Sequence, residues 1–278
     1  MVTVANPTSD RISMDFEPIN ADHAVESVVL ILSLNRILED REIASVRSGH
    51  GIWRADLPAV TSATAMVVRS KSETEPPAPV YTSGIEFSHV RPDGTSAWSL
   101  KVVGLQIAVE CYRYTRWARV WEQMSRLISS VCDKISEIDK NIEIRSVSLG
   151  MTDKFRATKD NYDLSTLISR NEFAPSYIFS AGPLWHNHSG WLQNDAQHAT
   201  LSLLNFDARR ESFFDPSDGV VKKSIFVSIT HTQEERIRDN KKLSDMIFVF
   251  NNDSILGLLV NKFHKKIRKF CQLFWSRA

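Results

Sequence analysis

The sequence has no long apolar run and few glycines, and each shortage excludes a class of protein. No apolar stretch reaches the ~18 residues of a transmembrane helix, so we expect no membrane span. With only 10 glycines, the chain has neither a GxxxxGK[ST] nor a GxGxxG pattern, which argues against nucleotide hydrolysis and dinucleotide chemistry. A GxSxG elbow is missing too, which argues against the α/β-hydrolase class.

Cysteines are also few, and their spacing excludes a disulfide framework. Cys111, Cys132 and Cys271 are odd in number and far apart, and no CxxC pattern offers a zinc site. Each cysteine lies within an apolar period, which is typical of a buried thiol in a reducing compartment. The polar N-terminus lacks the charged and apolar regions of a signal peptide. We therefore predict a cytoplasmic protein.

Neither sign of charge is in excess. The formal net charge is +1, so no bulk attraction draws the chain to nucleic acid or to a membrane. Hydrophobic residues make up 42% and charged residues 24% of the 278 residues, as in ordinary globular proteins. We predict a single α+β domain over residues 1–278, with two structurally similar halves at about 1–140 and 141–278.

A hairpin is the clearest strand feature. Arg91-Pro92-Asp93-Gly94 is a turn signal between Ile85–Val90 and Trp98–Tyr112. In the second segment the apolar alternation changes parity at Val103-Gly104, as a β-bulge would produce. We predict one long strand with a bulge. Further strands are predicted at 25–34, 51–57, 65–69, 142–151, 177–180, 200–208, 221–230 and 246–250.

Two apolar stripes at three- and four-residue steps predict long helices at Thr115–Ile138 and Ser254–Phe274. The strands precede each helix, so the predicted fold is α+β, with antiparallel sheet segments each followed by a long amphipathic helix. Exposed edges of such sheets need cover, and pairing between protomers would give a homodimer.

The segment PLWHNHSGW carries the first candidate site. His186 and His188 would share one face of a strand, and with His198 they would form a divalent metal site, with Asp195 nearby. Such a site would suit a metal-dependent hydrolase or nuclease. The alternative is that these histidines bond only to backbone or water.

Trp185 and Trp191 flank these histidines. Two tryptophans beside a glycine and polar residues would line a ligand pocket. The alternative is that their rings bury area over the end of a sheet.

The second candidate site is the polar face of the C-terminal helix, which would bind nucleic acid or anionic lipid. Its cations are Lys262, Lys265, Lys266, Arg268 and Lys269. The alternative is a helix packed on the core with a solvated face.

Several segments together resemble a sporadically distributed prokaryotic family of uncharacterised cytoplasmic proteins. They are DFEP at 15–18, AWSLKVVGLQIAVECYRYTRW leading into a helix, IEIRSVSLGMTDKF, HATLSLLNFDAR and the C-terminal helix. The family's Tyr-x-x-Trp matches Tyr114 and Trp117, and its final histidine and phenylalanine match His264 and Phe270. Ser146–Phe155 departs from the LRYINRI-like strand of the family.

The resemblance implies no established activity, and the family's patchy distribution suggests an accessory gene of a defence or toxin–antitoxin operon. A fold-level analogy links the chain to SecB-type chaperones. We predict a non-enzymatic binding protein without a cofactor, whose partner is a protein rather than a small molecule. Nucleic-acid binding and metal-dependent hydrolysis are the alternatives.

Overall fold

The computed structural model describes residues 15–20, 23–69, 78–170, 173–194, 198–215 and 217–243. Its strands are β1 (Phe16–Pro18), β2 (Val25–Leu34), β3 (Ala59–Arg69), β4 (Ala78–Val90), β5 (Ser96–Val103), β6 (Gln106–Cys111), β7 (Glu143–Ala157), β8 (Trp185–Asn194), β9 (His198–Asp215) and β10 (Val220–Lys242). The α-helices are α1 (Asp40–Ser48) and α2 (Trp117–Ser136), and three 3-10 turns are η1 (Gly49–Ile52), η2 (Leu164–Thr166) and η3 (Ser176–Phe179).

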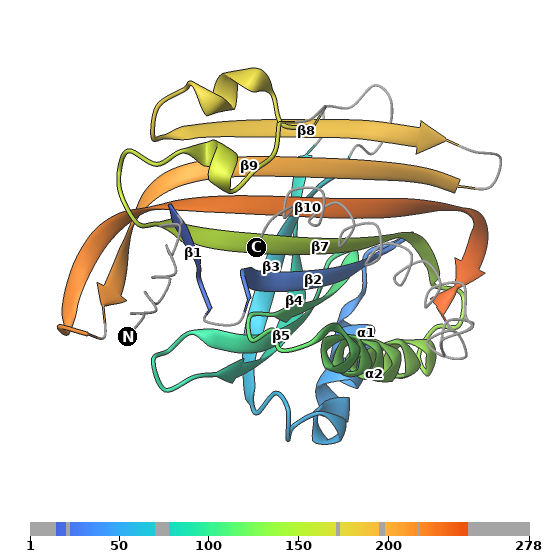
Figure 1. Ribbon diagram of the computed structural model, residues 1–278. Helices are drawn as coiled ribbons and strands as arrows, with labels where there is room; N and C mark the ends of the chain where they lie inside the picture. The colour runs from blue at the N-terminus through green and yellow to red at the C-terminus, as the bar shows by residue number, and fades with distance from the viewer. Residues whose placement is uncertain are drawn as a thin grey trace, which may run out of the picture.

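All of these strands belong to one antiparallel sheet (Figure 1). The order is β3-β4-β5-β6-β2-β7-β10-β9-β8, and β1 pairs with the end of β7. The predicted fold class is therefore wrong, because the strands do not form separate segments, each with its own helix. The physical reason is that β2 and β7 pair with each other from Val25 to Leu34, which joins the halves. The helix predicted at Ser254–Phe274 lies outside the described residues.

The order of strands repeats about the β2–β7 pair. In the first half, β2 is central, and the chain crosses to the sheet's outer side and returns through β4, β5 and β6 to pair with β2. In the second half, β7 is central, and the chain returns through β8, β9 and β10 to pair with β7. Apart from β1, which lies off this order, the first half has one more strand, β3, outside β4. Each half thus has the same inner-strand and meander topology.

One face of the sheet, which we call the helix face, carries Leu30, Leu100 and Leu149 and packs against α1 and α2. Those three leucines are completely buried, as are Met124 and Ile128 on the apolar stripe of α2. The stripe confirms the first predicted helix, which begins at Trp117 rather than Thr115. None of the described helices is long and apolar enough to cross a membrane.

A second apolar cluster lies on the helix face of the other half. It joins Phe206, Val227 and Trp185 of the sheet to Leu164 and Ile178 of the segment between β7 and β8. That segment covers one end of β8 and β9 (Figure 1). Sequence patterns predicted a strand at 177–180, but three of these residues, 177–179, belong to the 3-10 turn η3 (Ser176–Phe179).

The expected bulge at Val103-Gly104 is a tight turn instead. β5 ends at Val103, β6 begins at Gln106, and Val103 pairs with Gln106, which leaves a two-residue loop. Gly104 has a φ of 60°, and no residue other than glycine has a positive φ in the described part of the chain. Glycine at the first loop position is the signature of a type II′ hairpin turn.

Candidate functional site

Strand β3 forms one edge of the sheet and bonds only to β4 among the described strands. It is eleven residues long, and its register with β4 runs from Ala59 to Arg69 without a bulge. Its β-branched residues, such as Val60 and Thr61, suit a strand. From Ala59 to Val68 it carries no charge and no proline. Natural edge strands usually carry a charged residue or a proline, because these residues prevent pairing with another chain.

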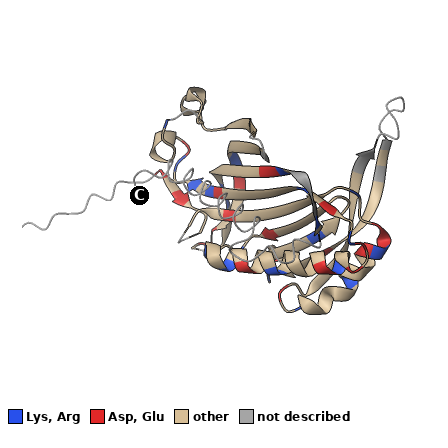
Figure 2. Ribbon diagram, turned by 90° about the vertical axis from the view of Figure 1, so that its right-hand side faces the viewer, with Lys and Arg blue, Asp and Glu red and all other residues tan. Residues whose placement is uncertain are grey.

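The outer part of the β3–β4 hairpin extends beyond β5. Pairing of β4 with β5 begins only at Gly84, whereas pairing with β3 starts at Ala78. Residues 64–69 and 78–83 therefore form a two-stranded ribbon, and the hairpin rises beside the rest of the sheet (Figure 2). Met66 and Tyr81 on this ribbon are 60% and 72% exposed. The outer edge of β3 and the side chains of Met66 and Tyr81 are thus accessible on this ribbon.

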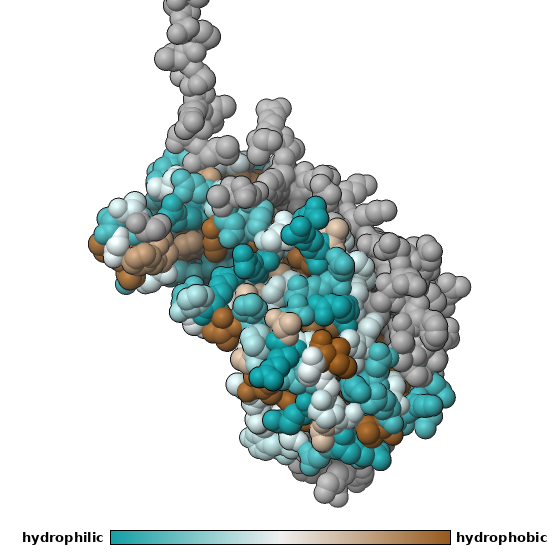
Figure 3. Space-filling model, turned by 90° about the horizontal axis from the view of Figure 1, so that it is seen from below, coloured by the Kyte–Doolittle hydropathy of each residue, from teal (hydrophilic) through white to brown (hydrophobic). Residues whose placement is uncertain are grey.

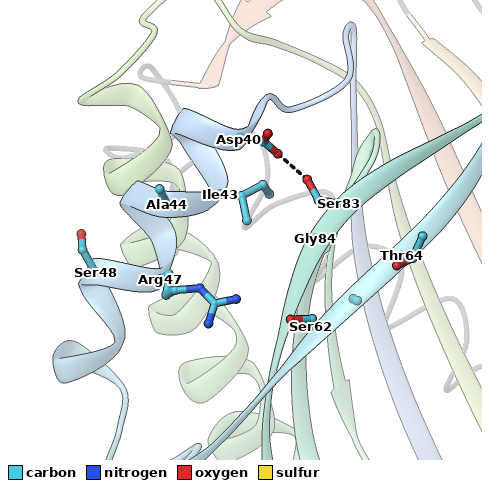
Figure 4. A pocket seen from close by; sticks show the side chains of 10 residues that line it. Asp40, Ile43, Ala44, Arg47, Ser48, Ser62, Thr64, Ser83 and Gly84 are labelled. Atoms are coloured by element: carbon cyan, nitrogen blue, oxygen red, sulfur yellow. Dashed lines mark hydrogen bonds between the residues drawn. The ribbon is translucent and has the colours of Figure 1, made fainter.

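A groove lies between α1 and the β3–β4 hairpin (Figure 4). Its volume is about 470 Å³. The residues that line it are small apart from Ile43 and Arg47, and the others are Asp40, Ala44, Ser48, Ser62, Ala63, Thr64, Ser83 and Gly84. Because these side chains are short, the groove leaves room for the side chains of a bound segment.

Charges of opposite sign stand on the helical wall of this groove. The hydroxyl of Ser83 donates to the carboxylate of Asp40 (2.5 Å), which links α1 to β4. Arg47 is exposed and points across the groove toward β3 (Figure 4). Within the described ranges, Arg47 forms no ion pair. The guanidinium is therefore available to an anionic group of a partner.

The opposite face of the sheet has a polar hollow of about 580 Å³. There, the hydroxyls of Ser99 and Tyr112 both donate to Glu110 (2.9 Å each), and Lys101 pairs with Glu86 (3.4 Å). Burial and the bond to Glu110 raise the pKa of Tyr112 to about 12. The hollow's acidic and basic groups thus satisfy one another, and no activated acid or base stands out among them.

The outer surface of the helices shows no comparable binding feature among the described residues. Seen from below, apolar residues are scattered among polar ones on the described part of that side (Figure 3). This is the mixed surface of an ordinary solvated face, in which single apolar residues need no partner. The helical side therefore does not compete with the β3 edge as a binding surface.

The predicted His186 and His188 lie on β8, the strand at the other edge of the sheet. They share one face, as a strand requires, and their ring centroids are 5.8 Å apart. His188 pairs with Asn205, which is seven residues along β9 from His198. At the rise of a strand this is roughly 23 Å, so the register keeps His198 away from the pair. Asp195 lies outside the described residues.

Within the described ranges, no three His, Cys, Asp or Glu side chains gather to hold a metal. The outer edge of β8 also differs from that of β3, because the Tyr177 hydroxyl donates to the carbonyl oxygen of His186 (3.1 Å). The segment between β7 and β8 thus occupies part of this edge.

Trp185 and Trp191 lie on the helix face of β8 and pack into the second apolar cluster. Trp185 is 8% exposed, and its indole N–H donates to the Tyr162 hydroxyl (3.0 Å). Trp191 packs between Phe173 and His231, with ring centroids at 5.2 and 6.4 Å. The rings therefore bury area, as the alternative interpretation had it, and do not line a described pocket.

The predicted nucleic-acid contacts at Lys262, Lys265, Lys266, Arg268 and Lys269 lie outside the described residues, so this hypothesis stays a prediction. The β3 edge was missed by sequence reasoning, which found only 65–69. The uncharged, β-branched run at 59–68 was the signal available.

We compared the chain with protein-family models, curated proteins and solved structures, and none of the three comparisons gave a match. The family resemblance and the analogy to SecB-type chaperones therefore stay predictions.

Proposed function

We propose that the protein is a non-enzymatic binding protein that holds an extended segment of a partner protein as an added strand along β3. The observation that carries this proposal is the unbulged and uncharged edge from Ala59 to Val68, which bonds only to β4 among the described strands. Strand addition of this kind derives affinity from main-chain hydrogen bonds and specificity from pockets for alternate side chains. An edge of this length would pair with a segment of several residues.

The groove beside α1 supports the same proposal. Ser62 and Thr64 of β3 line it, so alternate side chains of an added strand would project over the same face. The short side chains of the groove would receive them, and Arg47 would pair with an anionic side chain or a terminal carboxylate. Arginine suits this role because its planar group binds a carboxylate through two parallel hydrogen bonds.

The proposal also includes a cytoplasmic location and a role in an accessory operon of the defence or toxin–antitoxin type. Cys111 and Cys132 support the location, because both are buried and unpaired thiols, which suits a reducing compartment. The operon role rests on the family resemblance alone. A homodimer formed through β3 is the competing occupant of the edge.

A peptide-display screen followed by fluorescence anisotropy tests the proposal. Linear peptides enriched on the wild-type protein would be labelled and titrated into variants with proline at Ala63 or at Thr64. Successive amides of a strand point to opposite sides. One of these prolines therefore removes a bond to β4, and the other removes an outward amide. We expect the variant whose proline replaces the outward amide to stay folded by circular dichroism. Its peptide affinity should fall at least about tenfold, because each outward hydrogen bond is worth ~1 kcal/mol and the proline ring also clashes with the added strand.

Proline at Gln193 on β8 is the matched control at the other edge, and it should leave peptide binding unchanged. Arg47→Glu should weaken peptides that carry an acidic residue and spare those that do not. The proposal fails if no peptide is enriched, or if the enriched peptides bind all folded β3 variants equally. Light scattering of the wild type at several concentrations reports the competing homodimer, which the same β3 proline would dissociate.

A further inference from the structure

The helix face of the second half contains a strip whose cover is not explained by the described helices. The strip consists of His231, Gln233 and Glu235 on β10 and Ser202 on β9, which are all on the helix face by register. Their exposed fractions are 3%, 4%, 3% and 0%. Polar side chains on an uncovered sheet face would be solvated, so these values indicate a covering segment.

The described helices pack elsewhere. Helices α1 and α2 contact each other and strands β4 and β6, and their apolar cluster extends onto β7, whereas η3 contacts β8 near the other end of the sheet. Figure 1 shows α1 and α2 at one corner of the sheet and the segment with η2 and η3 over the end of β8 and β9. The strip lies between these two covered regions, beside the buried apolar residues Leu149 and Leu204.

The repeat of topology indicates which segment provides the cover. In the first half, β6 returns to the central strand β2, and α2 then packs on the helix face. In the second half, β10 returns to the central strand β7 in the same way. The next part of the chain, residues 244–278, lies outside the described residues, and its sequence carries the amphipathic pattern Ser254–Phe274. This pattern occupies the position in the chain that α2 has in the first half.

The length of the segment after β10 and the place where it starts are both compatible with its covering the strip. The amide of Leu243 donates to the carbonyl oxygen of Ile142 (2.7 Å), which fixes the end of β10 beside the start of β7. The ten residues from 244 to 253 reach at most ~35 Å, enough to lead back over the sheet. A helix of this length measures ~31 Å. The strand from Ile225 to Glu235 spans roughly 35 Å, so the helix would cover most of it.

We infer that Ser254–Phe274 docks as a helix on the strip of the second half, in the manner of α2 on the first. The apolar stripe Ile255, Leu259, Phe263 and Ile267 faces the sheet in this arrangement, beside Leu149 and Leu204. The lysines at 265 and 269 point to solvent.

Photo-crosslinking on the full chain tests this inference. Replacing Phe263 by p-benzoylphenylalanine keeps an aromatic ring, and the same residue in place of Lys265 serves as the control. Residues two apart lie ~200° apart around a helix, so we expect the Lys265 position to cross-link to the sheet at least about fivefold less. Mass spectrometry should place the Phe263 cross-links in peptides 200–206 and 229–235.

Mixing chains of two isotopic compositions before irradiation distinguishes docking within one chain from docking on a second copy. We expect cross-links between peptides of equal mass label only. Mixed-label cross-links, cross-links to other strands, or equal yields from the two positions would each overturn the inference. Neither result depends on whether β3 binds a peptide.

Discussion

Gly84 allows β4 to approach the end of β5 closely where the two strands begin to pair, and its replacement by alanine should destabilise the protein. A Cβ at this position would lie 2.5 Å from the Cβ of Val103 and 2.7 Å from the carbonyl oxygen of Val102. Ordinary contacts between carbons are ~3.5–4.0 Å, so the new methyl group would be about 1 Å too close. A β-carbon and a main-chain oxygen do not rotate away, so β4 itself would have to move.

The expected cost follows from two opposing effects. Overpacking of a tight site costs ~1–3 kcal/mol, and the lower entropy of the unfolded chain returns ~0.4–1 kcal/mol. We expect Gly84→Ala to lower the free energy of unfolding by about 2 kcal/mol. With a urea m-value near ~3 kcal/mol/M, the midpoint would fall by about 0.7 M.

Urea titration followed by circular dichroism measures this change. Gly51→Ala is the matched control, because a Cβ there would meet nothing within 4 Å, and it should stay within ~0.5 kcal/mol of wild type. An unchanged midpoint for Gly84→Ala would refute the reasoning, since it would mean that β4 does not approach Val103 of β5 this closely. Displacement of the hairpin should also lower the affinity of any ligand that binds in the groove beside α1.

Three further predictions concern the core. Arg36→Met should cost about 3 kcal/mol in urea titrations, because it leaves the completely buried Glu42 carboxylate without the guanidinium at 2.9 Å. In the wild type, burial raises the pKa of Glu42, but the hydrogen bond from Arg36, the Glu39 amide and the charge of Arg41 together lower it by more, so the net shift is downward. The stability that the ionised carboxylate contributes is present above pH 4.5 and is lost as the pH falls through the folded pKa. Because Arg41 and the Glu39 amide remain, Arg36→Met should reduce this acid dependence. Burial raises the pKa of Cys111 to about 11, so iodoacetamide at pH 8 should label it only after denaturation, and labelling in the native state would contradict its burial. Trp185→Phe removes the donor to Tyr162 and should cost about 1 kcal/mol by urea titration; no loss would mean that water replaces the indole.

The local elements were predictable where a pattern was long and periodic. The stripe from Val120 to Ile135 on α2 and the apolar run at 25–34 are confirmed as helix and strand. Helix α1 was missed, because nine residues with three buried members, Glu42 among them, show no convincing stripe. The turn at 104–105 was taken for a bulge, since both place a glycine where the alternation changes parity.

The single sheet was not predictable in the same way. Whether the edges of β2 and β7 meet depends on contacts between residues more than a hundred positions apart, and neither strand's pattern specifies its neighbour. The metal site predicted at the histidines could not be judged from the sequence for the same reason, because it also depends on how distant strands pair. The shared face of His186 and His188 followed from strand spacing, but the distance to His198 required the register of β8 with β9. The β3 edge was hidden because small alanines and the polar Ser62 interrupt its apolar alternation.

Residue-resolved amide hydrogen exchange by NMR over residues 59–66 tests the central claim most directly. In the free protein, the account predicts alternation, with amides bonded to β4 protected and the outward amides exchanging fast. Addition of an enriched peptide should protect the outward amides as well and remove the alternation. Uniform protection of β3 in the free monomer, or outward amides that still exchange fast at saturating peptide, would contradict the proposal that β3 is an open edge that binds an added strand.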